Sequence, residues 1–596
     1  MVDQKDILLD LLTVHSAYDV QAIQRTGDFT FLSKLSGLPQ VWKLNENDEP
    51  IQFIHAHDRV QSVYHSPSGD RTVVGIDREG NEKQQLYIVG AAGGAPEVLV
   101  ESMEHFHHCG GWSPDGRYIS YSSNRRSPGY FDVFVMDVDT KEVKQVFTHN
   151  GNCIPLGWVD EQTLFVNVKE TNIDSTIHVV CLQTGNHYQI GDHDVLARYE
   201  APVMKKDGEV GYVLTDENEE TLYLSAFSID EPDELTNLLH WDSWDIDAIS
   251  LAPKEDVLAF CLNEGGMTKL GMYNTSSSEW EWVENIPNGV IGSMSWRSEN
   301  ALLFTLKTPT EPGDVWEYDR LSGTVTRLTF IGKFETSRNL VEPELYTYRS
   351  FDGLQIPYFM YHQGQPDNKP AIIYVHGGPE SQIKAEYNPI FQFLVYQGFT
   401  VVAPNIRGSK GYGRSYIKLD DADKRLDAVA DLASLAKELT DAHQVLPNKI
   451  GIMGRSYGGF MVLAALSHYP NLWAAGVDIV GMSNLKTFLQ NTGEWRRGLR
   501  EYEYGSLNMY SDYFDKIAPM NLSENITAPL LVFHGRNDSR VPVSEAEQLV
   551  QDLESRDRDV ELIVFEDEGH QTSKIENHVA LHTKTVQFLN RHLNQN

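Results

Sequence analysis

The first half of the chain alternates short β-type runs with polar turns, and this alternation recurs at a regular spacing. The turn Ser113-Pro114-Asp115-Gly116-Arg117, for example, is followed by the β-type run 118–121. An early unit at Gly27-Asp28 matches a later one at Gly69-Asp70. Successive markers lie 47, 45, 45, 49 and 44 residues apart, at Ser66, Ser113, Trp158, Val203, Ala252 and Trp296. Seven units of this length, each with several short strands, predict a seven-bladed β-propeller.

A different pattern follows the last repeat. Residues 344–361 read as a hairpin around a polar turn, and helical segments then alternate with short apolar runs. The runs lie at 371–375, 400–403, 450–453, 474–480, 530–533 and 562–565. Alternation of this length predicts a doubly wound, mostly parallel sheet, in which functional sites lie at the carboxyl ends of the strands.

Composition narrows the classes of partner. The chain has 596 residues, with 85 acidic and 49 basic side chains and a formal charge of −36. Nucleic acid is an unsuitable partner, since phosphate binding needs a concentrated basic face. We expect no membrane span, because no uncharged apolar run approaches 18 residues. The first residues read as an amphipathic helix and not as a secretion signal, and four well-separated cysteines favour free thiols in the cytoplasm.

The candidate chemistry centres on Gly454-Arg455-Ser456-Tyr457-Gly458, with Gly459 directly after it. An apolar run precedes this segment and a helical run follows it. A serine at the apex of a strand-to-helix turn needs glycines two residues away on either side, because the strained backbone leaves no room for side chains. We interpret Ser456 as a nucleophile; the alternative is a tight structural turn.

A serine hydroxyl reacts only when an imidazole can take its proton and a carboxylate holds that imidazole in the right tautomer. The acid and then the histidine should follow the serine, each just past a strand. Asp538 and His570 meet this rule. The rival acid, Asp478, lies one strand too early, and the rival histidine His534 belongs to the acid's own turn.

Acyl transfer also needs donors aimed at the developing oxyanion. The amide of Tyr457, directly after the nucleophile, is one predicted donor. The loop His376-Gly377-Gly378-Pro379 follows an earlier strand, and its glycines allow the backbone to approach a substrate closely. It is the expected source of the second donor, although a plain turn would look the same.

With these residues placed, the chain resembles the prolyl oligopeptidase family of serine peptidases, and within it the acylaminoacyl peptidases, or acylpeptide hydrolases. The further marks are Asn405-Ile406-Arg407-Gly408-Ser409, Asn537-Asp538-Ser539-Arg540-Val541-Pro542 and Glu568-Gly569-His570. The resemblance implies an N-terminal helical segment at 1–19 that packs on the hydrolase domain, a seven-bladed β-propeller at 20–335 and an α/β-hydrolase catalytic domain at 336–596.

The same resemblance implies site residues. Gly378 would supply the second oxyanion donor, and Arg540 would hold the carbonyl on the amino-terminal side of the scissile residue; a surface arginine is the alternative for Arg540. The family's specificity pocket lies between the nucleophile helix and the acid, where this chain has apolar side chains, although an ordinary helix core would look alike. These pocket candidates are Leu485, Phe488, Trp495 and Leu499.

The expected activity is hydrolysis of short peptides through an acyl-enzyme, with removal of N-acylated or apolar N-terminal residues and a propeller that limits substrate size. No cofactor and no metal ion is required. The expected partners are short peptide substrates, with no nucleic acid and no membrane, and a homo-oligomer stays open. The alternatives are a carboxylesterase of the same fold, an endo-acting oligopeptidase, and a propeller scaffold with an idle hydrolase domain.

Overall fold

The computed structural model describes residues 4–192, 194–334, 339–364 and 369–594. Its contacts divide the chain into two units, each of which is described by itself. The propeller unit contains His15–Lys333, and the α/β unit contains Met1–Val14 together with Phe334–Asn596. The domain boundaries expected from the sequence lie after residues 19 and 335. Residue 335 lies outside the described residues.

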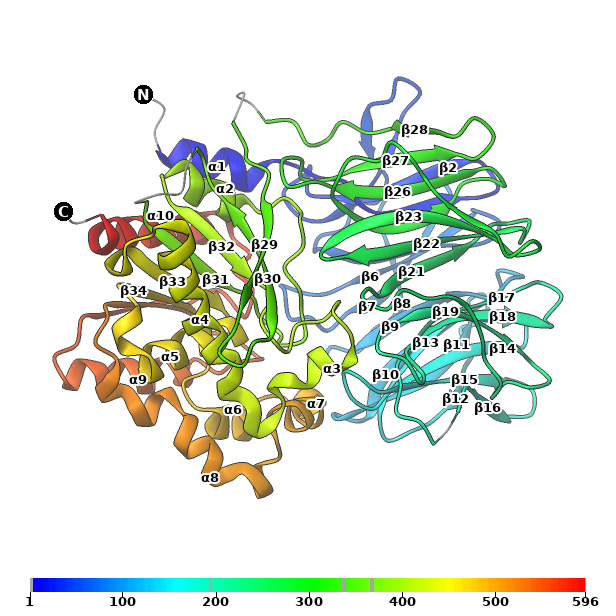
Figure 1. Cartoon of the computed structure of the whole chain (residues 1–596). Coiled ribbons are helices and arrows are strands. Elements are labelled where there is room, and N and C mark those ends of the chain that lie inside the picture. Colours follow the sequence, from blue (N-terminus) through cyan, green and yellow to red (C-terminus); the bar gives the residue numbers. More distant parts are fainter. Residues whose placement is uncertain (1–3, 193, 335–338, 365–368, 595–596) are drawn as a thin grey trace. The chain divides into compact units, whose positions relative to one another are not determined.

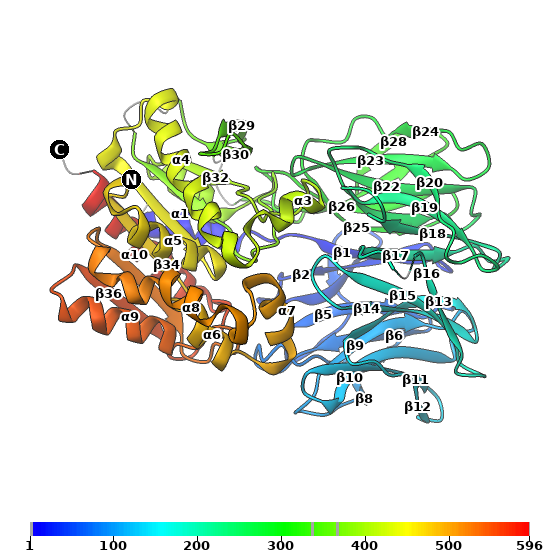
Figure 2. The same ribbon diagram turned by 60° about the horizontal axis from the view of Figure 1, so that its bottom comes forward.

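The described part of the propeller unit consists of groups of four antiparallel strands that follow one another along the chain (Figures 1 and 2). The third and fourth groups are joined into one eight-stranded sheet by a parallel pairing of Phe131 with Asn152. The first three blades are β1 (Tyr18–Ile23), β2 (Asp28–Ser33), β3 (Gln40–Leu44) and β4 (Pro50–Gln52); β5 (Val60–His65), β6 (Arg71–Ile76), β7 (Gln85–Gly90) and β8 (Glu97–Val100); and β9 (His107–Trp112), β10 (Tyr118–Ser127), β11 (Tyr130–Asp137) and β12 (Val143–Phe147).

The next four blades repeat this arrangement. They are β13 (Asn152–Asp160), β14 (Thr163–Lys169), β15 (Ser175–Cys181) and β16 (His187–Ile190); β17 (Tyr199–Met204), β18 (Val210–Thr215), β19 (Tyr223–Ser228) and β20 (Thr236–Leu239); β21 (Ile246–Leu251), β22 (Val257–Glu264), β23 (Met267–Asn274) and β24 (Trp280–Trp282); and β25 (Val290–Trp296), β26 (Ala301–Lys307), β27 (Asp314–Asp319) and β28 (Thr324–Arg327). The predicted seven-bladed propeller is confirmed.

A tryptophan at the end of a blade's first strand explains part of the sequence period. The indole nitrogens of Trp112, Trp158 and Trp296 each donate to a carbonyl on the first strand of the preceding blade, at 2.9, 3.3 and 3.1 Å. Each indole therefore buries its ring between two sheets and satisfies its N–H there. Side chains of the last blade close the ring, since Ser293 Oγ accepts from the Val20 amide at 2.7 Å and Ser295 Oγ accepts from the Ala22 amide at 3.0 Å.

The α/β unit is built on one eight-stranded sheet with the order β29-β30-β32-β31-β33-β34-β35-β36. The first two neighbouring pairs are antiparallel and the remaining pairs are parallel. The strands are β29 (Glu344–Arg349), β30 (Gln355–Tyr361), β31 (Ala371–Val375), β32 (Thr400–Pro404), β33 (Ile450–Arg455), β34 (Ala475–Ile479), β35 (Leu530–Gly535) and β36 (Val560–Phe565). The predicted mostly parallel sheet is confirmed.

Helices cover both faces of this sheet (Figure 1). A side chain at Gly451 would meet Leu589 of α10, whereas one at Gly476 would meet Leu466 of α5, so these two helices lie on opposite faces. The α-helices are α1 (Gln4–Thr13), α2 (Pro389–Tyr396), α3 (Arg414–Ile417), α4 (Arg425–His443), α5 (Tyr457–His468), α6 (Leu485–Asn491), α7 (Glu494–Tyr504), α8 (Leu507–Ile517), α9 (Ser544–Ser555) and α10 (Ile575–Leu593). The short 3-10 turns are η1 (Lys418–Asp420), η2 (Ala422–Lys424), η3 (Pro447–Lys449), η4 (Pro470–Leu472) and η5 (Pro519–Asn525).

The first helix belongs to the α/β unit although the propeller unit follows it in the sequence. It buries Ile7, Leu8 and Leu11, and the Tyr387 hydroxyl donates to the Leu11 carbonyl at 2.9 Å. None of the helices in the described part of the chain combines the length and the apolar composition that crossing a bilayer requires.

Candidate active site

Ser456 stands between β33 and α5 with φ 59° and ψ −119°, a backbone conformation that a residue with a side chain rarely adopts. The chain is crowded on both sides of it. A Cβ at position 454 would lie 2.3 Å from the Gly458 carbonyl oxygen, and one at 458 would lie 2.1 Å from the Val375 carbonyl oxygen. Both glycines are therefore sterically required, and the turn presents the serine at the carboxyl end of β33.

Asp538 and His570 follow β35 and β36, and their side chains meet at Ser456. The imidazole joins the other two groups: His570 Nδ1 lies 2.7 Å from Asp538 Oδ2, and Nε2 lies 3.2 Å from Ser456 Oγ. A carboxylate only accepts, so Nδ1 carries the proton and Nε2 is free to accept from the serine hydroxyl. The structure thus brings the three predicted side chains into one hydrogen-bonded line.

The carboxylate is fixed by its own loop. Asp538 Oδ1 accepts from the amides of Arg540 at 2.8 Å and Val541 at 2.9 Å. Burial alone would raise the pKa of Asp538, but the hydrogen bond and the charge of His570 outweigh burial and leave this pKa below its usual value. Asp538 is therefore ionised at neutral pH and able to stabilise an imidazolium.

Burial acts in the opposite direction on the base. It lowers the pKa of His570, while the hydrogen bond and charge of Asp538 raise it and the charges of Arg455 and Arg540 lower it further. The net result is a pKa below the usual histidine value, so the imidazole is neutral at neutral pH and able to accept a proton. Such tuning is typical of a general base that works near neutral pH.

The two predicted oxyanion donors lie beside the serine. Tyr457 is the first residue of α5, where backbone N–H groups have no acceptor within the helix. The Gly377-Gly378 segment passes close by, because a Cβ at Gly377 would lie 3.4 Å from Ser456 Cβ. Gly378 has φ +134°, which favours glycine, and its carbonyl accepts from Arg500 at 2.9 Å. This arrangement directs the loop's carbonyl toward α7.

The four predicted pocket residues fall into two groups. Leu485 and Phe488 of α6 are each 1% exposed and pack in the apolar core of the α/β unit, so neither lines an open surface here. Trp495 and Leu499 lie on α7 and are half-buried. Arg540 directly follows the turn of Asp538 and is partly exposed, with its carbonyl accepting from Thr492 Oγ1 at 3.0 Å.

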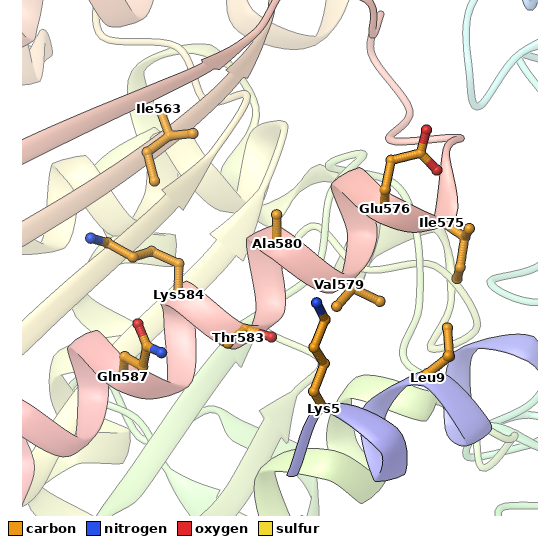
Figure 3. A pocket seen from close by; sticks show the side chains of 10 residues that line it. All are labelled: Lys5, Leu9, Ile563, Ile575, Glu576, Val579, Ala580, Thr583, Lys584 and Gln587. Atoms are coloured by element: carbon orange, nitrogen blue, oxygen red, sulfur yellow. The ribbon is translucent and has the colours of Figure 1, made fainter. Parts of the chain in front are cut away.

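A separate cavity of about 630 Å³ lies between α1, α10 and β36 (Figure 3). Leu9, Ile563 and Val579 give it apolar walls, with Lys5 and Lys584 at its sides. None of the predicted site residues lines it.

Comparison with known proteins gives the family of the segment that contains Ser456, Asp538 and His570. Residues 385–596 match the prolyl oligopeptidase family. The chain carries a prolyl oligopeptidase family domain. This match contains Ser456, Asp538 and His570, and it begins just after the loop of Gly378.

The names of the domain's relatives denote different activities. Dipeptidyl aminopeptidase BIII of Pseudoxanthomonas mexicana is 28% identical over 288 residues, which are 46% of this chain and 42% of that protein. The acylamino-acid-releasing enzyme of Homo sapiens is 24% identical over 253 residues, 41% of this chain and 34% of that protein. The chain thus spans less than half the length of these relatives.

A solved structure shows the fold of the whole chain. A Mycobacterium tuberculosis puromycin-hydrolyzing peptidase has a TM-score of 0.89 with 16% sequence identity, covering 100% of this chain and 96% of that one. This likeness extends the agreement in fold beyond the family domain to the propeller unit.

Sequence reasoning missed several groups that hold the site in place. The Arg455 guanidinium donates to the carbonyl of His570, and the buried Glu568 carboxylate accepts from the amides of Ser573 and Lys574, both at 2.9 Å. His534, set aside as a rival base, is 1% exposed and its Nε2 lies 2.9 Å from the Val541 carbonyl oxygen in the acid's loop. Arg455 and Glu568 belong to motifs quoted from the sequence, and His534 belongs to the turn of Asp538. Their positions in these segments were the available signal.

A second missed group contacts the first residue of α5, just after the turn that carries Ser456. Arg425 is fully buried and donates to the Tyr457 hydroxyl at 2.9 Å, to Asp420 and to Glu503. Asp420, Asp421 and Glu503 are close enough to hold a metal ion, but the Arg425 guanidinium already pairs with Asp420 and Glu503. We therefore assign the acidic group to Arg425 and not to a cation site.

Proposed function

We propose that this protein is a serine peptidase that hydrolyses short peptides through an acyl-enzyme on Ser456. The observation that carries the proposal is the position of His570, whose two nitrogens lie within hydrogen-bond distance of Asp538 and Ser456. The family match of residues 385–596 supports the same reaction class.

In the proposed mechanism, His570 Nε2 takes the hydroxyl proton as Ser456 Oγ attacks the scissile carbonyl carbon. Asp538 stabilises the resulting imidazolium. The amides of Tyr457 and Gly378 stabilise the oxyanion, and the loss of one such donor typically costs about 3 kcal/mol. His570 then protonates the leaving amine, and a water molecule repeats the sequence to release the acyl group.

For the substrate we propose an acylated or apolar residue on the amino-terminal side of the scissile bond. The relatives named acylamino-acid-releasing enzyme and dipeptidyl aminopeptidase support an enzyme that acts near a peptide's amino terminus. In this proposal Arg540 holds the preceding carbonyl, and Trp495 and Leu499 supply apolar contacts. The propeller's role in limiting substrate length rests on the resemblance to the family, and the four free cysteines support a reducing compartment such as the cytoplasm.

A graded set of substrates tests this proposal. We expect kcat/KM for an N-acetylated amino-acid anilide to exceed that for the same anilide with a free amino group by about tenfold or more. Hydrolysis should fall to background in Ser456→Ala. Rapid turnover of a simple nitrophenyl ester with no anilide or peptide cleavage would contradict the peptidase assignment, and a preference for the free amino terminus would favour a dipeptidyl peptidase.

A further inference from the structure

The α/β unit contains a half-buried arginine, Arg496, whose Nη1 atom is buried without a hydrogen-bond partner among the described residues. Helix α7 carries Arg496, Arg497 and Arg500, and the last two have clear structural partners. The Arg497 guanidinium donates to the carbonyls of Gln490 and Thr492, both at 3.2 Å. The Arg500 guanidinium donates to the Gly378 carbonyl and forms an ion pair with Glu380 at 3.5 Å.

Arg496 has no such partner in the part of the chain that the structure describes. Its Nη1 is buried without a hydrogen bond, and its guanidinium lies over the Trp495 ring at 5.6 Å. A desolvated cation without an acceptor is costly, and structures normally pair it or leave it in water. The buried side of this guanidinium has therefore lost water without gaining an acceptor, and an incoming anion could supply that acceptor.

Two tethers place Arg496 beside the candidate active site. Arg496 and Arg500 are four residues apart and share one face of α7, and Arg500 holds the loop of Gly378. The other end of the helix is tied to the acid's loop, because Thr492 donates to the Arg540 carbonyl at 3.0 Å. Arg496 thus lies on the helix that connects the proposed oxyanion loop to the loop of Asp538.

The local charge agrees with this placement. Burial, followed by the charges of Arg500 and Arg540, lowers the pKa of Arg496 to about 10, and the charge of Asp538 also acts on it. Arg496 is still protonated at neutral pH. Arg500 is already paired with Glu380, so the positive charge left for an incoming anionic group is that of Arg496.

We propose that Arg496 binds a substrate carboxylate next to the scissile bond, so that the enzyme prefers substrates with a carboxylate at this position. This inference rests on the proposed peptidase function and names its substrate class. A guanidinium pairs with a carboxylate through two parallel N–H donors, which gives both affinity and orientation. The carboxylate has two sources, namely the side chain of an acidic residue and the free α-carboxylate of the leaving residue.

Two pairs of substrates separate these sources. In the first pair, N-acetyl-glutamate anilide is compared with N-acetyl-glutamine anilide. In the second pair, an N-acetylated dipeptide with a free α-carboxylate is compared with its carboxamide. We expect wild-type kcat/KM to favour the carboxylate member of one pair by about tenfold or more, and Arg496→Gln to reduce this preference to less than about threefold.

Matched variants control for folding and charge. Arg497→Gln removes the same charge from the neighbouring position and should keep the preference, and Arg496→Lys should keep part of it. Arg496→Gln should retain turnover of the neutral member of each pair within about threefold. If Arg496→Gln does not fold, the wild-type preference and the Arg496→Lys variant still decide the matter.

The outcomes separate this inference from the function on which it rests. Equal turnover of both members in both pairs, or an unchanged preference in Arg496→Gln, would overturn the carboxylate site while the Ser456-dependent peptidase stands. If no substrate is cleaved, the proposed function fails. In that case, the labelling of Ser456 by a fluorophosphonate is measured with N-acetyl-glutamate or N-acetyl-glutamine present. Slower labelling with N-acetyl-glutamate would support the site, and equal labelling rates would refute it.

Discussion

Ser456 depends on its neighbour in the sequence as well as on its two partners. The Arg455 guanidinium donates to the backbone carbonyl of His570, 115 residues later. The residue before the proposed nucleophile therefore anchors the loop that carries the proposed base. Its charge also lowers the pKa of His570, after the larger effect of burial.

The pH profile of kcat/KM tests the role of Arg455. Activity requires neutral His570, and a lowered pKa keeps the imidazole neutral at lower pH, so the wild-type acid limb should lie below pH 6.5. Arg455→Gln removes a positive charge, raises the pKa of His570 and should move this limb to higher pH, with a loss of activity of up to about 100-fold from misplacement of the base. Arg455→Lys keeps the charge and should keep the position of the limb. An unmoved limb in Arg455→Gln would refute this role.

Among single residues, the sequence predicted those whose order along the chain follows a known pattern. Ser456, Asp538 and His570 could be found because each follows a strand in a fixed order. Arg425 could not, because its partners Tyr457 and Glu503 lie 32 and 78 residues away and no motif links them. Periodicity also fails to distinguish a pocket from a core, which is why Leu485 and Phe488 were assigned to a pocket although both are buried.

Among the elements, the turn between β33 and α5 leaves no room for a side chain at Gly458. Gly458→Ala would place a Cβ 2.1 Å from the Val375 carbonyl oxygen, and backbone cannot move aside as a flexible side chain can. We expect a loss of activity of more than about 100-fold and a destabilisation of about 1–3 kcal/mol. Assays of kcat/KM and thermal melts measure both effects.

Gly498→Ala is the matched control for this substitution. Gly498 lies on α7 and is exposed, and a Cβ added there would meet no neighbouring group within 4 Å. Alanine in a helix is favoured over glycine by about 0.5–1 kcal/mol, so this variant should be as stable as wild type or more stable. Comparable damage from both substitutions would show that the crowding at Gly458 is not decisive.

The number of blades and the type of sheet were predictable from repeating patterns. The order of the strands within the α/β sheet was not. The spacing of turns gave the blade number, and strand-helix alternation gave the mostly parallel sheet. The exchange of β31 and β32 in the sheet order depends on crossover connections that local patterns do not encode. Helix α4 begins only at Arg425, because two 3-10 turns precede it and Ala422 has φ 49°.

For the molecule as a whole, the α/β unit is discontinuous in sequence. Its first helix precedes the propeller unit, and its remaining elements follow that unit. The described contacts of α1 with α2 and α10 place the start of the chain among elements more than 370 residues away. Folding of this unit therefore requires that the two ends of the chain meet.

Two neighbouring leucines test this requirement. Leu8 is fully buried, whereas Leu9 is 42% exposed. Leu8→Ala should destabilise the α/β unit by about 2–5 kcal/mol through a lost contact and a cavity. Leu9→Ala should cost less than about 1 kcal/mol. Loss of Ser456 reactivity during a thermal melt reports the unit that contains the site, and equal midpoints for the two variants would contradict the docking of α1.

The central claim is that His570, held by Asp538, activates the hydroxyl of Ser456. The most direct measurement is the rate of covalent labelling by a fluorophosphonate, with the modified residue mapped by peptide mass spectrometry. We predict a single adduct on Ser456 in wild type, no adduct in Ser456→Ala, and labelling slowed by at least about 1,000-fold in His570→Ala. Equal labelling of wild type and Ser456→Ala, or undiminished labelling of His570→Ala, would contradict the account.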